Sequence, residues 1–190
     1  MSGRGVLFVD HAGVLSGAEL SLLDLASAFR ADSEVLLLAD GPFRAALEAR
    51  GVRVTVESLR ALKSVKKETR IPGPAALADA LRMSRHVARR AKAHRLIHAN
   101  SQKAFVVAAA AGLLARRPVV WHLRDILAPP HFSATNVRAA VTLANLRAAR
   151  VIANSRATAA AFVGAGGHES LVRVVHNGIE PAPFDAVTPE

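Results

Sequence analysis

The chain has 190 residues, enough for one α/β domain that buries its own core without metal or disulfide cross-links. It contains no cysteine, which excludes disulfides, thiol nucleophiles and cysteine-ligated zinc. Its 25 lysines and arginines outnumber its 15 aspartates and glutamates, so the formal net charge is +10. Such an excess attracts nucleic acid, an anionic membrane or a phosphorylated substrate. Aromatic residues make up only 4% of the chain, which disfavours base stacking on single-stranded nucleic acid.

No segment has the length of a membrane-spanning helix or the features of a signal peptide. The longest apolar stretch, Ala104 to Ala115, is shorter than the roughly 20 residues that a spanning helix needs. The apolar run Val6 to Val9 is too short for the core of a signal peptide, and Asp10 and His11 interrupt it. We therefore expect a cytoplasmic protein.

The first twenty residues predict a strand, a tight loop and the start of a helix. A buried strand at 6–9 is followed by a loop with Gly13 and Gly17 and by a helix over about 17–29. The loop after such a strand is a ligand-binding place in open α/β sheets. Glycines there allow positive φ and a close approach of substrate, and the helix N-terminus suits a phosphate or diphosphate.

Two other patterns in this loop limit that interpretation. Ser16 and Glu19 have the spacing of a capping box, so both side chains are also explained by closing the helix end. The glycine spacing is not G-x-G-x-x-G, and no Walker A sequence is present. A dinucleotide-binding fold and a P-loop ATPase are therefore not indicated.

Strand and helix patterns alternate along nearly all of the chain. Further strands are predicted at 34–39, 52–56, 95–98, 119–121, 151–153 and 171–175. Helices are predicted at 43–50, 75–93, 103–115, 133–149 and from about 156 to 163. This alternation predicts an α/β domain with a mostly parallel sheet of about seven strands and right-handed crossovers.

Basic residues cluster in one loop and on the helix after it. The segment 59–74 has no clean period, and it carries Arg60, Lys63, Lys66 and Lys67. The helix at 75–93 places Arg82, Arg85 and Arg89 on one face, beside an apolar stripe of Leu77, Leu81, Val87 and Ala88. We expect these seven cations to meet an anionic lipid surface or a lipid phosphate, although a charge run is also explained by solvation alone.

Polar side chains gather at the carboxyl ends of the predicted strands, which form the ligand-binding edge of an open α/β sheet. They are His11, His98, Asn100, His122, Arg124, Asn154 and Ser155. Asn100, Ser101, Asn154 and Ser155 are also good helix N-caps, and each histidine is also explained as a hydrogen-bonded structural group. The histidines lack a ligand spacing and a carboxylate cluster, so no metal site is expected.

The last residues differ in composition from the rest. After Asn177 and Gly178, the segment 179–190 is rich in proline and predicts an extended linker. We therefore expect one domain over 1–178 and the beginning of a connection to a second domain over 179–190.

Four blocks carry a resemblance to a known family: GVLFVDHAGVLSGAELSLLDLA, RPVVWHLRD, VIANSRATAAAF and VVHNGIEPAPF. In this order they resemble the N-terminal half of the family 4 (group 1) retaining glycosyltransferases with the GT-B fold. The resemblance implies a Rossmann-like, three-layer α/β/α domain that receives the acceptor. It also implies that a second Rossmann-like domain, absent here, holds most of the nucleotide-sugar, and that Phe184 and Asp185 belong to the connection between the two.

The resemblance also assigns roles to individual residues. It implies that the loop with Gly13, Ser16, Gly17 and Glu19 lies near the donor diphosphate, and that His122 contacts the transferred sugar or reacting centre. Arg124 and Asp125 are expected to line the same cleft. Independently of the resemblance, His98, Asn100, Asn154 and Ser155 are candidate substrate- or donor-binding residues because of their place at the strand ends. Ser16 stands where the family has the first glycine of a Gly-Gly-Ala-Glu pattern.

The sequence as a whole predicts the acceptor-binding domain of a retaining, hexosyltransferase-type enzyme. We expect a nucleotide-sugar donor, a lipid-linked or other cell-envelope or polysaccharide acceptor, and no metal or other cofactor. The place of action would be the cytoplasm or the inner face of the cell membrane. The chain alone should be inactive, because transition-state stabilisation needs both sides of the cleft. The alternative is a basic α/β module that binds nucleic acid or another polyanion without catalysis.

Overall fold

The computed structural model describes residues 4–57, 74–128 and 132–178. The strands in chain order are β1 Arg4–Asp10, β2 Glu34–Leu37, β3 Val54–Val56, β4 His94–Ala99, β5 Val119–Leu123, β6 Ala148–Ala153 and β7 Val172–Val174. The helices are α1 Gly17–Ala28, α2 Pro42–Ala49, α3 Pro74–Ala91, α4 Gln102–Ala115, α5 Ala134–Arg147 and α6 Arg156–Gly164, with a 3₁₀ turn at Glu169–Leu171.

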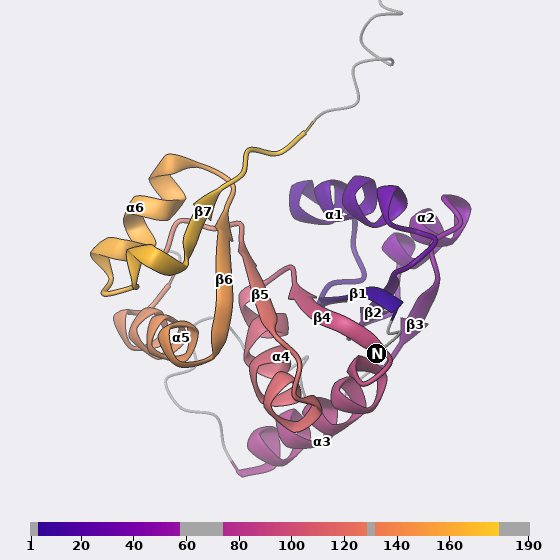
Figure 1. Cartoon of the computed structure of the whole chain (residues 1–190), viewed down its shortest axis with the longest axis horizontal. Coiled ribbons are helices and arrows are strands. Elements are labelled where there is room, and N and C mark those ends of the chain that lie inside the picture. Colours follow the sequence, from indigo (N-terminus) through magenta and orange to yellow (C-terminus); the bar gives the residue numbers. More distant parts are fainter. Residues whose placement is uncertain (1–3, 58–73, 129–131, 179–190) are drawn as a thin grey trace, which may run out of the picture.

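The seven strands form one parallel sheet in the order β3-β2-β1-β4-β5-β6-β7. Strand order reverses between β1 and β4, so the topological switch point lies between these two strands. The prediction of a Rossmann-like sheet of about seven strands is confirmed (Figure 1).

Alternating side chains on the strands divide the core into two layers. Leu7 and Val9 of β1 face α3 and α4, whereas Phe8 faces α1 and α2. On the side of α3 to α6 the core is continuous across the sheet from Leu36 of β2 to Val172 of β7. The core against α1 and α2 is smaller and involves only β1, β2 and β3. Figure 1 shows α1 and α2 together on one side of the sheet and α3 and α4 on the other.

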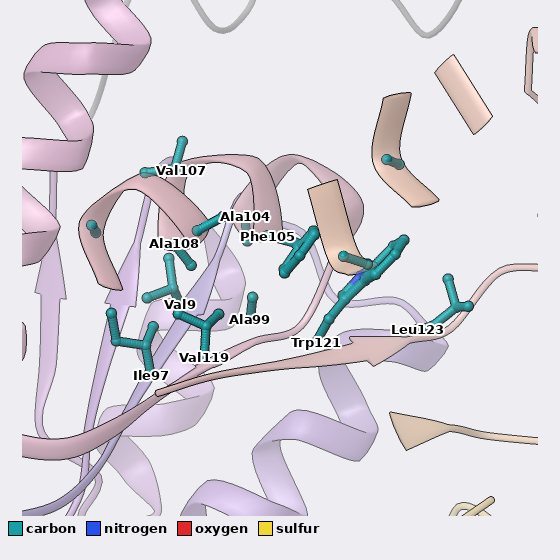
Figure 2. Close-up of a cluster of buried hydrophobic side chains, with 14 of the residues drawn as sticks. Val9, Ile97, Ala99, Ala104, Phe105, Val107, Ala108, Val119, Trp121 and Leu123 are labelled. Atoms are coloured by element: carbon teal, nitrogen blue, oxygen red, sulfur yellow. The ribbon is translucent and has the colours of Figure 1, made fainter. Parts of the chain in front are cut away.

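Helix α4 is the central helix of the larger layer. Its sequence is apolar on most of its circumference, and Ala104, Phe105 and Ala108 are fully buried. Figure 2 shows Phe105 lying against Trp121 of β5, and the two rings are stacked with centroids 4.6 Å apart. This packing fixes β5 from one face, which leaves the alternate β5 side chains directed to the other face.

Three differences from the sequence predictions stand out. Strand β6 begins at Ala148, three residues before its predicted start, where the preceding helix was expected to continue to 149. The apolar stripe of α3 is formed by Met83, Val87 and Ala91, which recur every four residues, with Ala88 beside them. Leu81 does not belong to this stripe and is 44% exposed. Strand β5 runs two residues beyond its predicted end, so His122 lies within the strand. The side chain of Leu77 and the basic segment with Arg60, Lys63, Lys66 and Lys67 lie outside the described part of the chain.

The loop after β1 packs directly against the turn after β2. Gly13 accepts a backbone hydrogen bond of 2.9 Å from the N–H of Phe43, and a Cβ at Gly13 would lie 2.4 Å from the carbonyl oxygen of Asp40. Gly13 is not among the described residues with positive φ, so backbone proximity is the reason for a glycine here. A Cβ at Gly17, the first residue of α1, would meet nothing within 4 Å. Among the described residues, no helix is long and apolar enough to span a bilayer.

We expect Gly13→Ala to destabilise the protein by about 1 to 3 kcal/mol, because its methyl group would overlap backbone atoms that no side-chain rotation can move. Gly17→Ala is the matched control and should be neutral or stabilising, since alanine has the higher helix propensity and the position is open. Urea denaturation of the three proteins measures the difference. Equal stabilities of the two variants would contradict this account of the loop.

Candidate functional site

The carboxyl edge of the sheet brings together polar residues from neighbouring strands. Asp10 ends β1, Asn100 follows β4, Arg124 follows β5, and Asn154 follows β6. Parallel strands end at the same edge, so residues separated by up to 144 positions in the chain become neighbours. The structure joins these four through hydrogen bonds.

Asp10 is the innermost member of the group and is fully buried. Its Oδ1 accepts the backbone N–H of His11 at 2.6 Å, and its Oδ2 accepts the side-chain amide of Asn100 at 2.6 Å. A buried carboxylate needs such donors, because taking it out of water is otherwise costly. The sequence analysis gave Asp10 no functional role, although an aspartate directly after an apolar strand is a recognisable signal.

Asn100 connects Asp10 to Arg124. Its Nδ2 donates to Asp10, and its Oδ1 accepts two bonds from the Arg124 guanidinium, at 3.1 Å from Nε and 2.8 Å from Nη2. Asn100 is fully buried, so the amide is held in one orientation. The predicted N-cap role instead belongs to Ser101, whose Oγ accepts the N–H of Ala104.

Arg124 then reaches α1 and the segment after β7. Its Nη1 donates to Ser21 Oγ at 2.7 Å and to Asn177 Oδ1 at 2.8 Å. Burial lowers the pKa of Arg124 to about 10, and the nearby Asp10 and Glu19 oppose this shift, so the guanidinium stays charged at neutral pH. Neither Ser21 nor Asn177 was predicted as a site residue, since a serine in a helix and an asparagine before a glycine are common.

His98 and His122 form a buried pair on the α1 side of the sheet. His98 Nε2 and His122 Nδ1 are 3.2 Å apart, and both side chains are 6% exposed. Burial lowers the pKa of His98 to about 3 and that of His122 to about 2, and the Arg124 cation adds to both shifts. Both rings are therefore neutral at physiological pH. We predicted His122 at the rim; it is buried instead, because it lies within β5.

The second ring nitrogen of His122, Nε2, is buried and has no hydrogen-bond partner among the described residues. His122 also lines a cleft of about 560 Å³. One wall of the cleft is α1, with Ser21, Asp24, Leu25 and Ala28, and the other is the segment Val175 to Gly178. Unpaired polar atoms are uncommon in protein interiors. A ligand in this cleft would lie next to the imidazole.

The start of α1 lies at the same edge. Ser16 precedes the helix, and its hydroxyl donates to the carboxylate of Glu19 without a side-chain cap bond to the backbone. The reciprocal capping box is therefore absent, although both residues pair with each other. Glu19 is 4% exposed. His11 Nδ1 is 2.8 Å from Ser101 Oγ, which ties this loop to the start of α4.

The remaining predicted residues have local roles or lie apart. Ser155 caps α6 by accepting the N–H of Thr158, and Asn154 donates to the carbonyl oxygen of Arg124 at 3.1 Å. Asp125 is exposed next to the edge. The arginines of the predicted basic face, Arg82, Arg85 and Arg89, are exposed on α3. Because α3 covers the other face of the sheet, these three do not join the site.

No metal site is evident in the described ranges. Within residues 4–57, 74–128 and 132–178, no three histidines, aspartates or glutamates are placed to hold an ion. The two buried histidines bond to each other, and the buried carboxylate of Asp10 is occupied by amide donors. The expectation that the site works without a metal stays a prediction.

Comparison with known proteins supports the resemblance seen in the sequence. Residues 16–178 match the family model described as Glycosyl transferase 4-like domain. No curated protein sequence matches the chain significantly.

Among solved structures, the Anabaena protein Alr3699/HepE in complex with UDP and glucose is 42% identical, with a TM-score of 0.81 over 94% of this chain and 46% of that chain. Its complex with UDP-glucose gives 41% identity and a TM-score of 0.79 over 94% and 45%. The lipopolysaccharide outer core galactosyltransferase WaaB in its apo form is 12% identical, with a TM-score of 0.66 over 92% and 46%, and shows the fold alone. The chain thus spans about half the length of these structures.

The two neutral histidines predict a specific loss of stability in acid. The pKa of each is lower in the folded protein than the value near 6.5 expected when unfolded, so below pH 6.5 the unfolded state takes up protons that the folded state refuses. Above pH 6.5 the pair should add no slope. As the pH falls from 6 to 4, each ring should lower the free energy of unfolding by about 1.4 kcal/mol for every pH unit.

Chemical denaturation at several pH values, with wild type and the double variant His98→Gln/His122→Gln, measures this slope. The double variant should lack the part of the acid slope that the two buried rings contribute. His168→Gln, which replaces an exposed histidine, is the matched control. An identical acid slope in the wild type and the double variant would show that the pair is not buried in the neutral form.

Proposed function

This chain belongs to the glycosyl transferase 4-like domain family, and we propose that it is the acceptor-side half of a GT-B glycosyltransferase. In this proposal a sugar moves from a nucleotide-sugar to an acceptor with retention of the anomeric configuration. The donor is held mainly by a second Rossmann-like half, and this chain supplies the opposite side of the cleft. The family match supports this function over a non-catalytic polyanion-binding module.

One observation carries the proposal: the carboxyl edge joins Asp10, Asn100 and Arg124 into one network beside a cleft that His122 lines, and the buried Nε2 of His122 has no partner among the described residues. The hydrogen-bond network holds the guanidinium of Arg124 in place, and strand β5 holds the neutral imidazole of His122 in place. Transfer of a sugar from a diphosphate leaving group needs both kinds of contact, because negative charge develops on the phosphate while the sugar must be held by its hydroxyls.

The donor class is supported by the solved structures of Alr3699/HepE, which hold UDP, glucose and UDP-glucose. A uridine diphosphate sugar is therefore the donor that we propose for the family member containing this chain. Arg124 would add positive charge on the diphosphate side of the cleft. The open position at Gly17 leaves the first turn of α1 accessible to the same group.

His122 would act as a neutral hydrogen-bonding group. A pKa near 2 means that the ring carries no charge at physiological pH, so it cannot serve there as a charged acid. With Nδ1 bonded to His98, the free Nε2 is the atom that would meet a sugar hydroxyl. We propose no divalent ion, because the Arg124 cation on this side would offset part of the diphosphate charge.

The exposed face of α3 suggests where the acceptor would come from. Arg82, Arg85 and Arg89 flank Leu81, which is 44% exposed. An apolar side chain among arginines is typical of surfaces that lie on anionic lipid, where the leucine enters the headgroup region. We propose a lipid-linked or other cell-envelope acceptor and a place of action at the inner face of the cell membrane.

The central test is loss of the His122 imidazole in a polypeptide that joins this chain to a nucleotide-sugar-binding half. With UDP-glucose as donor, release of UDP by His122→Ala should fall by on the order of 100-fold, as for the loss of other preorganised hydrogen-bonding groups in active sites. Because His122 is buried, the variant should also lose thermal stability. The chain of 190 residues alone should release no UDP.

Ile152→Ala separates the two effects. Ile152 is the register partner of His122 on β6 and faces the same side of the sheet, so its truncation also removes packing but takes away no imidazole. It should lower the melting temperature while keeping UDP release within a few-fold of wild type. Near-normal turnover of His122→Ala would overturn the role that we propose for His122.

Membrane binding by the α3 face is tested with vesicles. Co-sedimentation of the chain should rise with the fraction of anionic lipid and fall with salt, since each surface arginine contributes about 1 kcal/mol at an anionic membrane. Replacing Arg82, Arg85 and Arg89 with glutamine should weaken binding on the order of 100-fold. A triple variant of the exposed arginines Arg138, Arg147 and Arg156 changes the net charge equally and should bind much as the wild type.

Equal loss of binding in both triple variants would mean that overall charge, and not this face, drives association. Tighter binding to DNA than to anionic vesicles at the same salt would favour the polyanion-binding alternative.

A further inference from the structure

The segment 175–178, which follows β7, is joined to the domain by hydrogen bonds of Val175 and Asn177. Val175 donates a backbone hydrogen bond of 2.9 Å to Ala153, the last residue of β6. Beyond it, the Asn177 side chain makes the hydrogen bonds that join residues 176–178 to the rest of the described chain. Asn177 Oδ1 accepts Arg124 Nη1 at 2.8 Å and the Ser21 hydroxyl at 3.3 Å.

Arg124 is hydrogen-bonded to both walls of the cleft. Its Nη1 donates to Ser21 in the α1 wall and to Asn177 in the opposite wall. The other side of the guanidinium is anchored through Asn100 to the buried carboxylate of Asp10. A planar guanidinium with several bound donors has a fixed orientation, so it can set the separation of the two walls.

The partners of Arg124 are neutral in each of these contacts. A guanidinium that served only to stabilise the core would need the bonds to Asn100 and nothing from the segment after β7. The bond to Asn177 is exposed to solvent and joins residues 53 positions apart. Its effect is therefore mainly to fix the position of the segment 175–178.

We propose that Arg124 and Asn177 are positioning residues that clamp the segment 175–178 against α1 and so fix the far wall of the cleft beside His122. The consequence for catalysis rests on the proposed function: the same segment would carry the chain toward the second half, so the clamp would set how the acceptor side presents His122. The clamp itself does not depend on any bound sugar.

The 190-residue chain is sufficient to test the clamp. In Asn177→Leu the acceptor for Arg124 is removed, and the ¹⁵N order parameters of residues 176–178 should fall from near 0.85 to below about 0.6. Hydrogen exchange of the Val175 amide should become about 5- to 10-fold faster, on the scale of losing one modest hydrogen bond. The Ile97 amide, bonded to Pro118 in the centre of the sheet, should be unchanged.

Asn177→Asp is the conservative variant. Its carboxylate still accepts from Arg124 and Ser21, so the order of residues 176–178 and the exchange rate of Val175 should stay at their wild-type values. Asn145→Leu is the matched control, since Asn145 holds a different loop through Gly166 and His168. It should loosen that loop and leave residues 176–178 ordered.

Three results would overturn the clamp: Asn177→Leu leaves residues 176–178 ordered, Asn177→Asp loosens them as much as leucine does, or Asn145→Leu loosens them too. Because order is measured without donor or acceptor, failure of the clamp is distinct from failure of the proposed function, which shows only in UDP release.

Discussion

The buried carboxylate of Asp10 is the group on which the candidate site depends. A charge without solvent must be surrounded by donors, and the structure provides them from the backbone of His11 and the amide of Asn100. The orientation of Asn100 that satisfies Asp10 leaves its oxygen free for Arg124. One electrostatic requirement at the end of β1 thus determines where a cation stands at the end of β5. Burial lowers the pKa of both histidines, and that cation lowers it further.

A second constraint comes from the alternation of side chains along the strands. Trp121 and Leu123 belong to the core beneath α4, so His122 between them must face the opposite side. On that side α1 and α2 pack only over β1 to β3, and the sheet beyond them borders the cleft. The same rule sends Ile97 and Ala99 to the core and His98 to the cleft side. Because apolar side chains of β4 and β5 pack into the core beneath α4, His98 and His122 both face the opposite side of the sheet, where they form a pair.

The fold was largely predictable from the sequence, because apolar runs, serine caps and the glycine at position 51 mark the elements locally. Ser133 and Ser155 precede helices that they cap, and Gly51 has the positive φ of a helix end. The site was predictable only as a set of strand ends. Sequence patterns do not show which side chains of different elements meet, so the pairing of His98 with His122 and of Arg124 with Asn177 could not be derived. The burial of His122 was missed because the end of β5 was placed two residues early.

Our central proposal is that the unpaired Nε2 of His122 binds a hydroxyl of the transferred sugar. The most direct measurement is a crystal structure of the chain joined to its nucleotide-sugar-binding half, with UDP-glucose bound. The account predicts a glucose oxygen within about 3.2 Å of His122 Nε2 while Nδ1 stays on His98. A glucose bound elsewhere, with Nε2 satisfied by a protein group, would contradict it.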